Sequence, residues 1–354
     1  MTDRNAHQPG QPTLSVVLPN YNHARFIGQA LDAFLAQQPP ADEILVVDDG
    51  STDDSVAVVE KYVAAHPSVR LIRHQRNRGV IAALNTGFHA ARGRYIYFGA
   101  ADDQTINGFF ASALTALAAH PETGLFCAEA LVLDGGSGRF YGFRPPVRPV
   151  NRAGPIDPAG VKRLLARSDN WILTGCAVFR RDAVAWAGGL DPALGSFADG
   201  YMARKIALTY GFCYAPQIVT KWYIYPGGVS RAMAYDLDKA RKILDLVPDK
   251  LTVDPVFPKW YPHLFQQRWR FAVARLALEH CPPDRALLLG MGAQSARDRN
   301  VLGAACRLPC SLASLVALAW LWYRFRPYPL GMLLSTFAAR LWARSRRSPA
   351  IGAT

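Results

Sequence analysis

The sequence lacks a long apolar run. Two uncharged stretches near the C-terminus, 308–323 and 327–339, both fall short of the roughly 20 residues that a membrane-spanning helix requires. Residues 1–13 are polar, so we expect a short disordered tail there and no secretory signal peptide.

Cysteine is scarce and badly spaced for a metal site. The six cysteines are spread along the chain, and Cys306 and Cys310 have no second pair or histidine cluster that would complete a zinc site. We therefore expect the cysteines to be reduced core thiols, which is typical of a cytosolic protein.

Acidic residues are few relative to basic ones, with 27 against 40 and a net charge of +13. The segment 301–354 contains seven arginines and no acidic residue, so it carries about half of the surplus. Such a segment suits an anionic partner, for example nucleic acid, a phosphate-bearing ligand or a membrane surface. Because no RNP-type motif, zinc-finger spacing or basic-plus-heptad pattern is present, we expect no nucleic-acid partner.

Short apolar, β-branched segments alternate with amphipathic segments through the N-terminal 133 residues. The first kind predicts strands and the second predicts helices. We expect strands at 14–18, 43–47, 69–74, 95–98 and 125–133, with helices at 24–37, 80–91 and 107–119 and a further helix that is capped by 52–54 and runs to about residue 65. This order indicates an α/β fold, with a mostly parallel sheet flanked by helices.

Beyond residue 133 the pattern is less regular. We expect a loop or lid at 134–158, a strand at 176–179, and another loop around Trp222, Tyr223 and Gly227-Gly228. Further helices are expected at 161–167, 182–187, 197–210, 236–246 and 263–280.

The uncharged stretches near the C-terminus allow two interpretations. They could be a helical pair that packs on the preceding domain. Alternatively, the helical face formed by Leu330, Leu333, Leu334, Phe337 and Leu341, with nearby tryptophans and arginines, suits an interfacial anchor on an anionic membrane leaflet.

Carboxylates follow two of the predicted strands, in Asp48-Asp49-Gly50-Ser51 and in Asp102-Asp103. Ligands of parallel sheets bind beyond the carboxyl ends of the strands, where both motifs fall. The adjacent carboxylates of Asp102 and Asp103 suit Mg²⁺ or Mn²⁺, which could bridge a diphosphate. Both motifs could instead be turns whose side chains cap the next helix, and so could Asp199 at the start of a later helix.

Three ordered segments carry a resemblance to a known family: LSVVLPNYN, EILVVDDGSTD and NRGVIAALNTGFHAARGRYIYFGAADD. Together they resemble the N-terminal half of family 2 glycosyltransferases of the GT-A fold. The resemblance covers about 14–133 and extends more weakly through 189–216. It implies inverting, metal-dependent transfer of a sugar from a nucleoside-diphosphate sugar, with Mn²⁺ or Mg²⁺ as the cofactor.

The resemblance also implies residue roles. Asp199 would be the catalytic base, and Asp103 and Asp102 would be the metal ligands. The donor nucleotide would be bound by Pro19, Asn20, Tyr21, Asp49, Ser51, Asn77, Arg78, Gly79 and Asp102.

The sequence departs from the family pattern at three points. Ala100 and Ala198 stand where acidic residues are common, and Phe265 replaces the first glutamine of the Gln-x-x-Arg-Trp motif that processive members carry. We therefore expect addition of a single sugar rather than polymer synthesis. The two alanines leave open a catalytically inactive protein that only binds sugar nucleotides.

Taken together, these patterns predict a GT-A domain over 14–230, a helical extension over 231–300 and a basic apolar segment over 301–354. The expected donor is a nucleoside-diphosphate sugar, with a UDP-sugar favoured, and the expected acceptor is a saccharide or a lipid-linked sugar. We expect the protein in the cytoplasm or peripherally on the cytoplasmic face of the inner membrane, in contact with an anionic surface.

Overall fold

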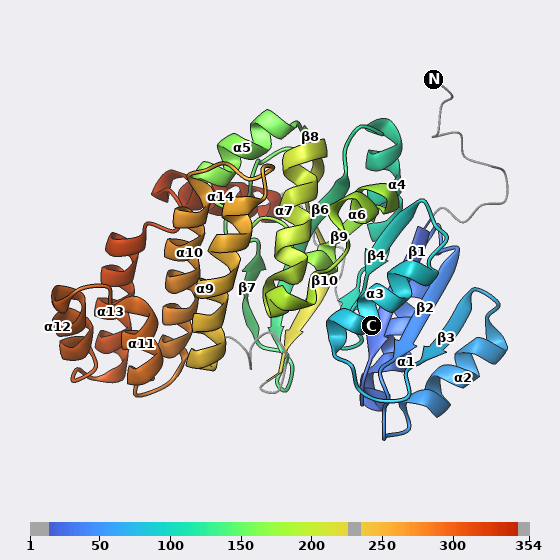
Figure 1. The fold of residues 1–354 in the computed structure, drawn as a ribbon, viewed down its shortest axis with the longest axis horizontal. Coiled ribbons are helices and arrows are strands. Elements are labelled where there is room, and N and C mark those ends of the chain that lie inside the picture. Colours follow the sequence, from blue (N-terminus) through green and yellow to red (C-terminus); the bar gives the residue numbers. More distant parts are fainter. Residues whose placement is uncertain (1–13, 226–234, 346–354) are drawn as a thin grey trace. The chain divides into compact units, whose positions relative to one another are not determined.

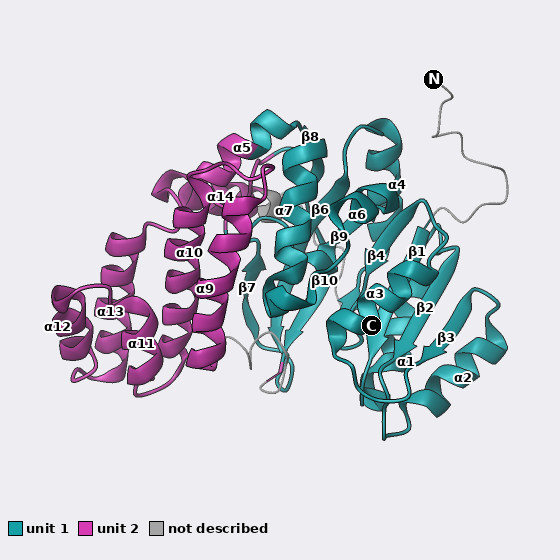
Figure 2. Cartoon of the chain, viewed as in Figure 1, with its two compact units in different colours: residues 1–146, 152–161, 170–224 teal, residues 147–151, 162–169, 225–354 magenta. Residues whose placement is uncertain are grey.

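The computed structural model describes residues 14–225 and 235–345. The expected tail at 1–13, the glycine pair Gly227-Gly228, and Arg346 and Arg347 lie outside these residues. The chain divides into two compact units. Unit 1 contains residues 1–146, 152–161 and 170–224, and unit 2 contains residues 147–151, 162–169 and 225–354 (Figure 2).

Unit 1 is built on a ten-stranded sheet with helices on its faces (Figure 1). Eight strands follow the order β3-β2-β1-β4-β9-β6-β10-β5, while β7 pairs with β6 and β8 with β10. The strands are β1 Leu14–Asn20, β2 Glu43–Asp48, β3 Val69–Arg73, β4 Tyr95–Phe98, β5 Gln104–Thr105, β6 Leu125–Asp134, β7 Phe140–Arg144, β8 Gly154–Ile156, β9 Ala177–Arg180 and β10 Phe212–Ile224.

The strands of the N-terminal half pair in parallel, as predicted. Strand β1 lies between β2 and β4, and every residue of β2 is buried. Such burial on both faces explains the continuous apolar runs of these strands. The register pairs Asn20 with Asp48, so the polar residues that follow β1 and β2 lie side by side.

Four helices connect the strands of this half at the predicted places: α1 Ala24–Leu35, α2 Ser55–Ala65, α3 Val80–Ala90 and α4 Phe109–Ala119. Helix α1 buries Ile27, Ala30, Leu31 and Phe34, the spacing of a single helical face. The Asp53 carboxylate accepts hydrogen bonds from the backbone N–H groups of Ala24 and Ser55, at 2.9 and 3.0 Å. One side chain therefore satisfies backbone donors at the starts of two helices.

The second half of unit 1 differs from the prediction in three places. Strand β9 runs antiparallel to both β4 and β6, so the sheet is mixed there. The segment expected as a loop at 134–158 contains β7 and β8, and β10 continues through Trp222 and Tyr223. The segments of β7 and β8 contain glycine and proline, which are uncommon in strands, so the sequence predicts a loop there. The aromatic residues of β10 extend the strand because they pair with β6.

The remaining helical elements of unit 1 follow the sheet strands. They are η1 Thr174–Cys176, α6 Arg181–Ala187, η2 Pro192–Phe197 and α7 Ala198–Tyr210. Helix α5, Pro158–Arg167, has residues in both units.

Unit 2 is helical. Its elements are α9 Leu237–Val253, α10 Tyr261–Leu276, η3 Ala277–Glu279, α11 Arg285–Gly292, α12 Ala296–Ala305, α13 Cys310–Phe325 and α14 Leu330–Ser345. Buried residues of α9 to α13 form one core, which includes Ala317, Leu321 and Phe325 of the basic apolar segment. Within the described ranges, no helix is both long enough and apolar enough to cross a membrane.

Asp298 joins α12 to α13 inside this core. Its buried carboxylate accepts hydrogen bonds from Trp320 Nε1 at 3.1 Å and from Arg324 Nε at 2.8 Å. Burial alone would raise the pKa of Asp298, but these donors, chiefly the Arg324 guanidinium, lower it below its ordinary value.

The expectation that the cysteines are reduced thiols is wrong for one pair. Cys281 and Cys310 form a disulfide with a Cα–Cα distance of 5.6 Å, whereas Cys127, Cys176 and Cys213 are free and buried. The paired residues are 29 positions apart, and packing of unit 2 brings them together. These two cysteines therefore no longer support the expectation of a reducing, cytosolic environment.

Close packing of α3 on the parallel strands generates the first prediction. An added Cβ at Gly87 would collide with Cγ1 of Val17 and lie 3.2 Å from Cγ2 of Val47. We expect Gly87→Ala to lower the free energy of unfolding by about 2 kcal/mol, the usual cost of overpacking. The matched control is Gly303→Ala in α12, where a Cβ meets no atom within 4 Å.

Gly303→Ala should leave stability unchanged or raise it by about 0.5–1 kcal/mol, because alanine favours a helix interior. Urea titration of both variants measures the difference. Equal midpoints would contradict the tight α3–β1 contact.

Candidate functional site

The loops that follow β1 and β2 are joined by side-chain hydrogen bonds. Asn20 Nδ2 donates to Asp48 Oδ1 at 2.8 Å and to Ser51 Oγ at 3.2 Å. Asn22, whose φ of 56° lies in the left-handed region, accepts from the Thr52 N–H at 2.8 Å. The segments that hold the predicted donor residues therefore form one polar surface at the carboxyl end of the sheet.

Asp49 connects this surface to the loop before α3. Its carboxylate accepts from the backbone N–H groups of Arg78 at 3.0 Å and Gly79 at 2.7 Å. His74 Nδ1 lies 2.6 Å from Asp49 Oδ1 and must be the donor, since an ionised carboxylate only accepts. A nucleobase N–H would have to share an oxygen that already has two donors.

The remaining predicted donor residues lie in β1, in the loop after it and in the loop before α3. The Asn77 side chain accepts from the Gly79 N–H at 2.9 Å, and Gly79 has a φ of 91°. Arg78 is exposed, and Tyr21 is 41% exposed, so both side chains are accessible to a ligand. Pro19 is the penultimate residue of β1 and lies next to Val47 of β2.

Asp102 and Asp103 follow β4 at the same end of the sheet. The backbone N–H of Tyr223 donates to Asp103 Oδ1 at 3.2 Å. Burial, with a contribution from the adjacent Asp102 carboxylate, raises the pKa of Asp103 well above its ordinary value. A divalent cation would offset this accumulated charge, and carboxylate oxygens are the ligands that Mg²⁺ and Mn²⁺ prefer, so the two residues fit such an ion.

The described residues contain no cluster of three or more histidine, cysteine, aspartate or glutamate side chains that could hold a metal ion.

The η1 turn lies between Asp103, the predicted metal ligand, and Asp199, the predicted catalytic base. The Gly175 carbonyl accepts hydrogen bonds from Thr220 Oγ1 at 2.9 Å and from the buried Tyr97 hydroxyl at 3.2 Å. A Cβ at Gly175 would lie 3.7 Å from Asp103 Oδ2. On its other side, Thr174 Oγ1 donates to Asp199 Oδ2 at 2.8 Å.

Asp199 lies in the first turn of α7, whose N-cap is Phe197 rather than Asp199. Its second oxygen, Oδ1, accepts from the Gly200 N–H at 2.6 Å. Both oxygens therefore have a donor that fixes their orientation, and the Thr174–Gly175 segment brings Asp199 into the neighbourhood of Asp103.

Sequence reasoning missed Thr174, Gly175, His74 and Tyr223. The first two precede β9, and they reach the carboxyl end of β4 only because β9 is antiparallel to it. A polar Thr-Gly pair before a buried strand that is antiparallel to β4 is the signal that indicates them.

A protein-family model described as Glycosyl transferase family 2 matches residues 15–185 of the sequence. This range contains Asp49, Asp103 and the η1 turn. This part of the chain is therefore similar to glycosyl transferase family 2.

Three curated relatives that are at least 31% identical match over short segments. The uncharacterized glycosyltransferase YibD of Escherichia coli is 36% identical over 29% of this chain and 29% of its own length. The putative teichuronic acid biosynthesis glycosyltransferase TuaG of Bacillus subtilis is 31% identical over 27% of this chain and 37% of its own. The succinoglycan biosynthesis protein ExoO of Rhizobium meliloti is 42% identical over 26% of each. The chain thus spans well under half the length of these relatives.

Two solved structures share the fold. Mannosyltransferase PcManGT from Pyrobaculum calidifontis, in complex with GDP-Man and Mn²⁺, has a TM-score of 0.56 and 23% identity, covering 94% of this chain and 88% of that one. S. aureus TarS 1–349, in complex with UDP-GlcNAc, has a TM-score of 0.57 and 13% identity, covering 88% and 91%. These similarities confirm the expected GT-A fold.

The contacts of Asp49 generate the second prediction. Asp49→Asn would place an amide NH₂ group where three N–H donors converge, so we expect the free energy of unfolding to fall by about 2 kcal/mol without any ligand. Asp54→Asn is the matched control, because Asp54 is exposed and its side chain caps no N–H group of α2. Thermal melting of both variants tests this. If Asp49→Asn melts as the wild type does, the Asp49 carboxylate does not stabilise the fold, and the prediction is wrong.

Proposed function

We propose that this protein transfers a single sugar, with inversion, from a nucleoside-diphosphate sugar to an acceptor hydroxyl. The observation that carries the proposal is the Thr174–Gly175 segment, which has Asp103 on one side and Asp199 on the other. Complexes of the two structural neighbours with GDP-Man and UDP-GlcNAc support a nucleotide-sugar donor. We favour a UDP-sugar.

The donor nucleotide would lie on the surface made by the loops after β1 and β2. Tyr21 offers an exposed ring to the base, and Asn20 and Ser51 hold the loop that presents this ring. Arg78 is exposed beside the Asp49 carboxylate, where its guanidinium could contact the diphosphate.

Asp103 and Asp102 would hold Mn²⁺ or Mg²⁺. When bound, such an ion would stabilise the negative charge on the departing diphosphate. Asp103 is held by the Tyr223 N–H, so the carboxylate is positioned before any donor binds. The Mn²⁺ in the PcManGT complex supports this assignment.

Asp199 would act as the general base. Inversion requires an acceptor oxygen to attack the anomeric carbon from the side opposite the diphosphate, while a base takes the hydroxyl proton. The Thr174 hydroxyl and the Gly200 N–H each donate to one oxygen of Asp199, which fixes the carboxylate plane. One lone pair on either oxygen remains available for the acceptor proton.

A second candidate is a catalytically inactive sugar-nucleotide-binding protein. Ala100 and Ala198 favour it, because acidic residues are common at these positions in the family. An inactive protein would keep nucleotide binding and lack transfer and hydrolysis.

The acceptor would be a saccharide or a lipid-linked sugar in the synthesis of a surface polysaccharide or glycolipid. The names of TuaG and ExoO, which refer to teichuronic acid and succinoglycan biosynthesis, support this choice. A lipid-linked acceptor would require the enzyme to work at a membrane.

We also propose peripheral contact with an anionic membrane, at the cytoplasmic face of the inner membrane. Helix α14 exposes Leu330, Leu334, Phe337 and Leu341, each at least half accessible, at intervals of four, three and four residues. This spacing forms one apolar strip. The segment 301–354 adds seven arginines and no acidic residue, which suits an anionic leaflet.

The third prediction tests the transferase. UDP, GDP, dTDP and ADP are each added with Mn²⁺, Mg²⁺ or EDTA, and melting is followed for the wild type, Asp103→Asn and Asp199→Asn. We expect one diphosphate to stabilise the wild type only with metal, by about 2.7 kcal/mol at 100 times its dissociation constant. Asp103→Asn should lose this stabilisation, while Asp199→Asn should keep it.

Turnover of the matching sugar donor completes this test. Asp199→Asn should reduce it by about 10²–10⁴-fold, because the proton acceptor is gone. Full turnover in Asp199→Asn would refute the base assignment. Metal-dependent binding without any wild-type turnover would favour the inactive binding protein.

The fourth prediction tests the membrane contact. Leu334→Gln and Phe337→Gln change side chains that are 60% and 61% exposed, so the fold should be retained. Each should lower the wild-type partition onto vesicles containing phosphatidylglycerol at least threefold, as expected when buried apolar area is lost. Val253→Gln, at a residue of α9 that is 76% exposed, is the control and should bind as the wild type does.

Sedimentation with vesicles measures the partition. A wild type that stays in the supernatant, or equal binding by all variants, would refute the contact. Truncation after Asn300 is unsuitable, since it removes Ala317 and Leu321 from the core of unit 2.

A further inference from the structure

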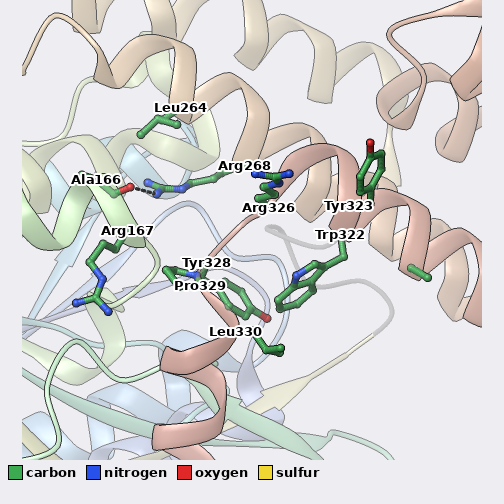
Figure 3. Close-up of a pocket in the computed structure, with 11 residues that line it drawn as sticks. Ala166, Arg167, Leu264, Arg268, Trp322, Tyr323, Arg326, Tyr328, Pro329 and Leu330 are labelled. Atoms are coloured by element: carbon green, nitrogen blue, oxygen red, sulfur yellow. Dashed lines mark hydrogen bonds between the residues drawn. The ribbon is translucent and has the colours of Figure 1, made fainter.

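Unit 2 contains a cavity of about 550 Å³ (Figure 3). It is lined by the end of α5, one side of α10, the last turns of α13 and the connection from α13 to α14. The lining residues are Ala166, Arg167, Leu264, Arg268, Ala319, Trp322, Tyr323, Arg326, Tyr328, Pro329 and Leu330. The lining has three arginines and no acidic residue, so it favours an anionic ligand.

One of these arginines already has partners. Arg268 donates to the carbonyls of Leu165 at 2.7 Å and Ala166 at 3.1 Å, which are at the end of α5, and its guanidinium lies 3.5 Å from Asp169. Its charge is therefore largely offset. It shapes the cavity and is a poor candidate for holding a ligand.

The other two arginines are available. Arg167 and Arg326 are exposed, and neither guanidinium has a hydrogen-bond or ion-pair partner in the part of the chain that the structure describes. In the view of Figure 3, Arg326 lies to the right of Arg268 and above the rings of Trp322 and Tyr328. An anion in the cavity would supply the acceptor that these two charges lack.

The backbone of Arg326 supports a role for its side chain. Arg326 caps the C-terminus of α13 with φ 42° and ψ 59°, a left-handed conformation that glycine usually occupies. An L-residue with a Cβ is disfavoured there. The chain keeps an arginine at this strained position, which places a charge in the cavity lining.

The rest of the lining is apolar and leads to the exposed strip of α14. Trp322 and Tyr328 meet edge to face with centroids 4.8 Å apart. Leu330 belongs both to the lining and to the strip that continues through Leu334, Phe337 and Leu341. A ligand that has a negatively charged headgroup and an apolar chain fits a basic cavity that continues into an apolar strip.

We propose that the cavity binds the phosphate headgroup of an anionic membrane lipid, with Arg326 and Arg167 on the phosphate and the acyl chains along the α14 strip. This inference rests on the membrane part of the proposed function and adds a headgroup site to it. The sugar-transfer part is independent of it, because donor binding and turnover are measured without lipid.

The test compares three substitutions in the full-length protein. Arg326→Gln and Arg167→Gln each remove one cavity charge. Arg307→Gln removes the same charge from an exposed residue of the same basic segment, outside the lining. Binding is measured by sedimentation with vesicles of phosphatidylcholine alone and of phosphatidylcholine with phosphatidylglycerol.

We expect Arg326→Gln and Arg167→Gln to lower the partition onto the anionic vesicles about fivefold or more, close to the contribution of one basic residue at a membrane surface. Arg307→Gln should lower it less than twofold. Equal losses in all three variants would mean diffuse charge attraction and would overturn the site. Wild-type binding that is the same on both kinds of vesicle would also overturn it.

Arg326→Gly separates ligand binding from a structural role. Glycine relieves the left-handed strain, so the melting temperature should rise by about 2 °C, while the partition onto anionic vesicles should fall as in Arg326→Gln. A rise in stability with unchanged partition would overturn the site. Inorganic phosphate is the last probe: protection against melting by millimolar phosphate, lost in Arg326→Gln and without any lipid preference, would assign the cavity to a soluble phosphate.

Discussion

The hydrogen bonds that hold the Gly175 carbonyl are the constraint on which the candidate active site depends. Two hydroxyls, from Tyr97 on β4 and Thr220 on β10, donate to this one oxygen. They fix the turn before β9 in a place where its first residue, Thr174, binds Asp199 and where a Cβ at Gly175 would contact Asp103. The two hydroxyls therefore hold the segment that lies between the carboxylate after β4 and the carboxylate on α7.

The parallel half of the sheet could be predicted from the sequence because its signals are local. Each strand is a short apolar run that is buried on both faces, and each ends in a polar turn. The register of β1 against β2 then brings Asn20 beside Asp48 without further information. The grouping of the polar loops after β1 and β2 follows from the same geometry, so these donor-loop residues could be found by spacing and resemblance.

The rest of the site depends on long-range pairing, which a single sequence does not reveal. Thr174 reaches Asp199 across 25 positions, and Tyr223 reaches Asp103 across 120. The antiparallel direction of β9 and the extension of β10 decide both contacts. The Cys281–Cys310 disulfide was missed for the same reason, because only the packing of helices in unit 2 brings the two sulfurs together.

The path of the chain between the two units has a practical consequence. Residues 147–151 and 162–169 belong to unit 2, although both neighbours of each segment along the chain belong to unit 1. The Arg148 N–H, for example, donates to Thr336 Oγ1 at 3.0 Å, a link of 188 positions. A single cut after residue 224 would leave these two segments attached to unit 1 and separated from the helices that they pack against. Neither unit can be prepared as one continuous fragment, so gene-level domain deletion is the wrong way to divide the roles of this protein.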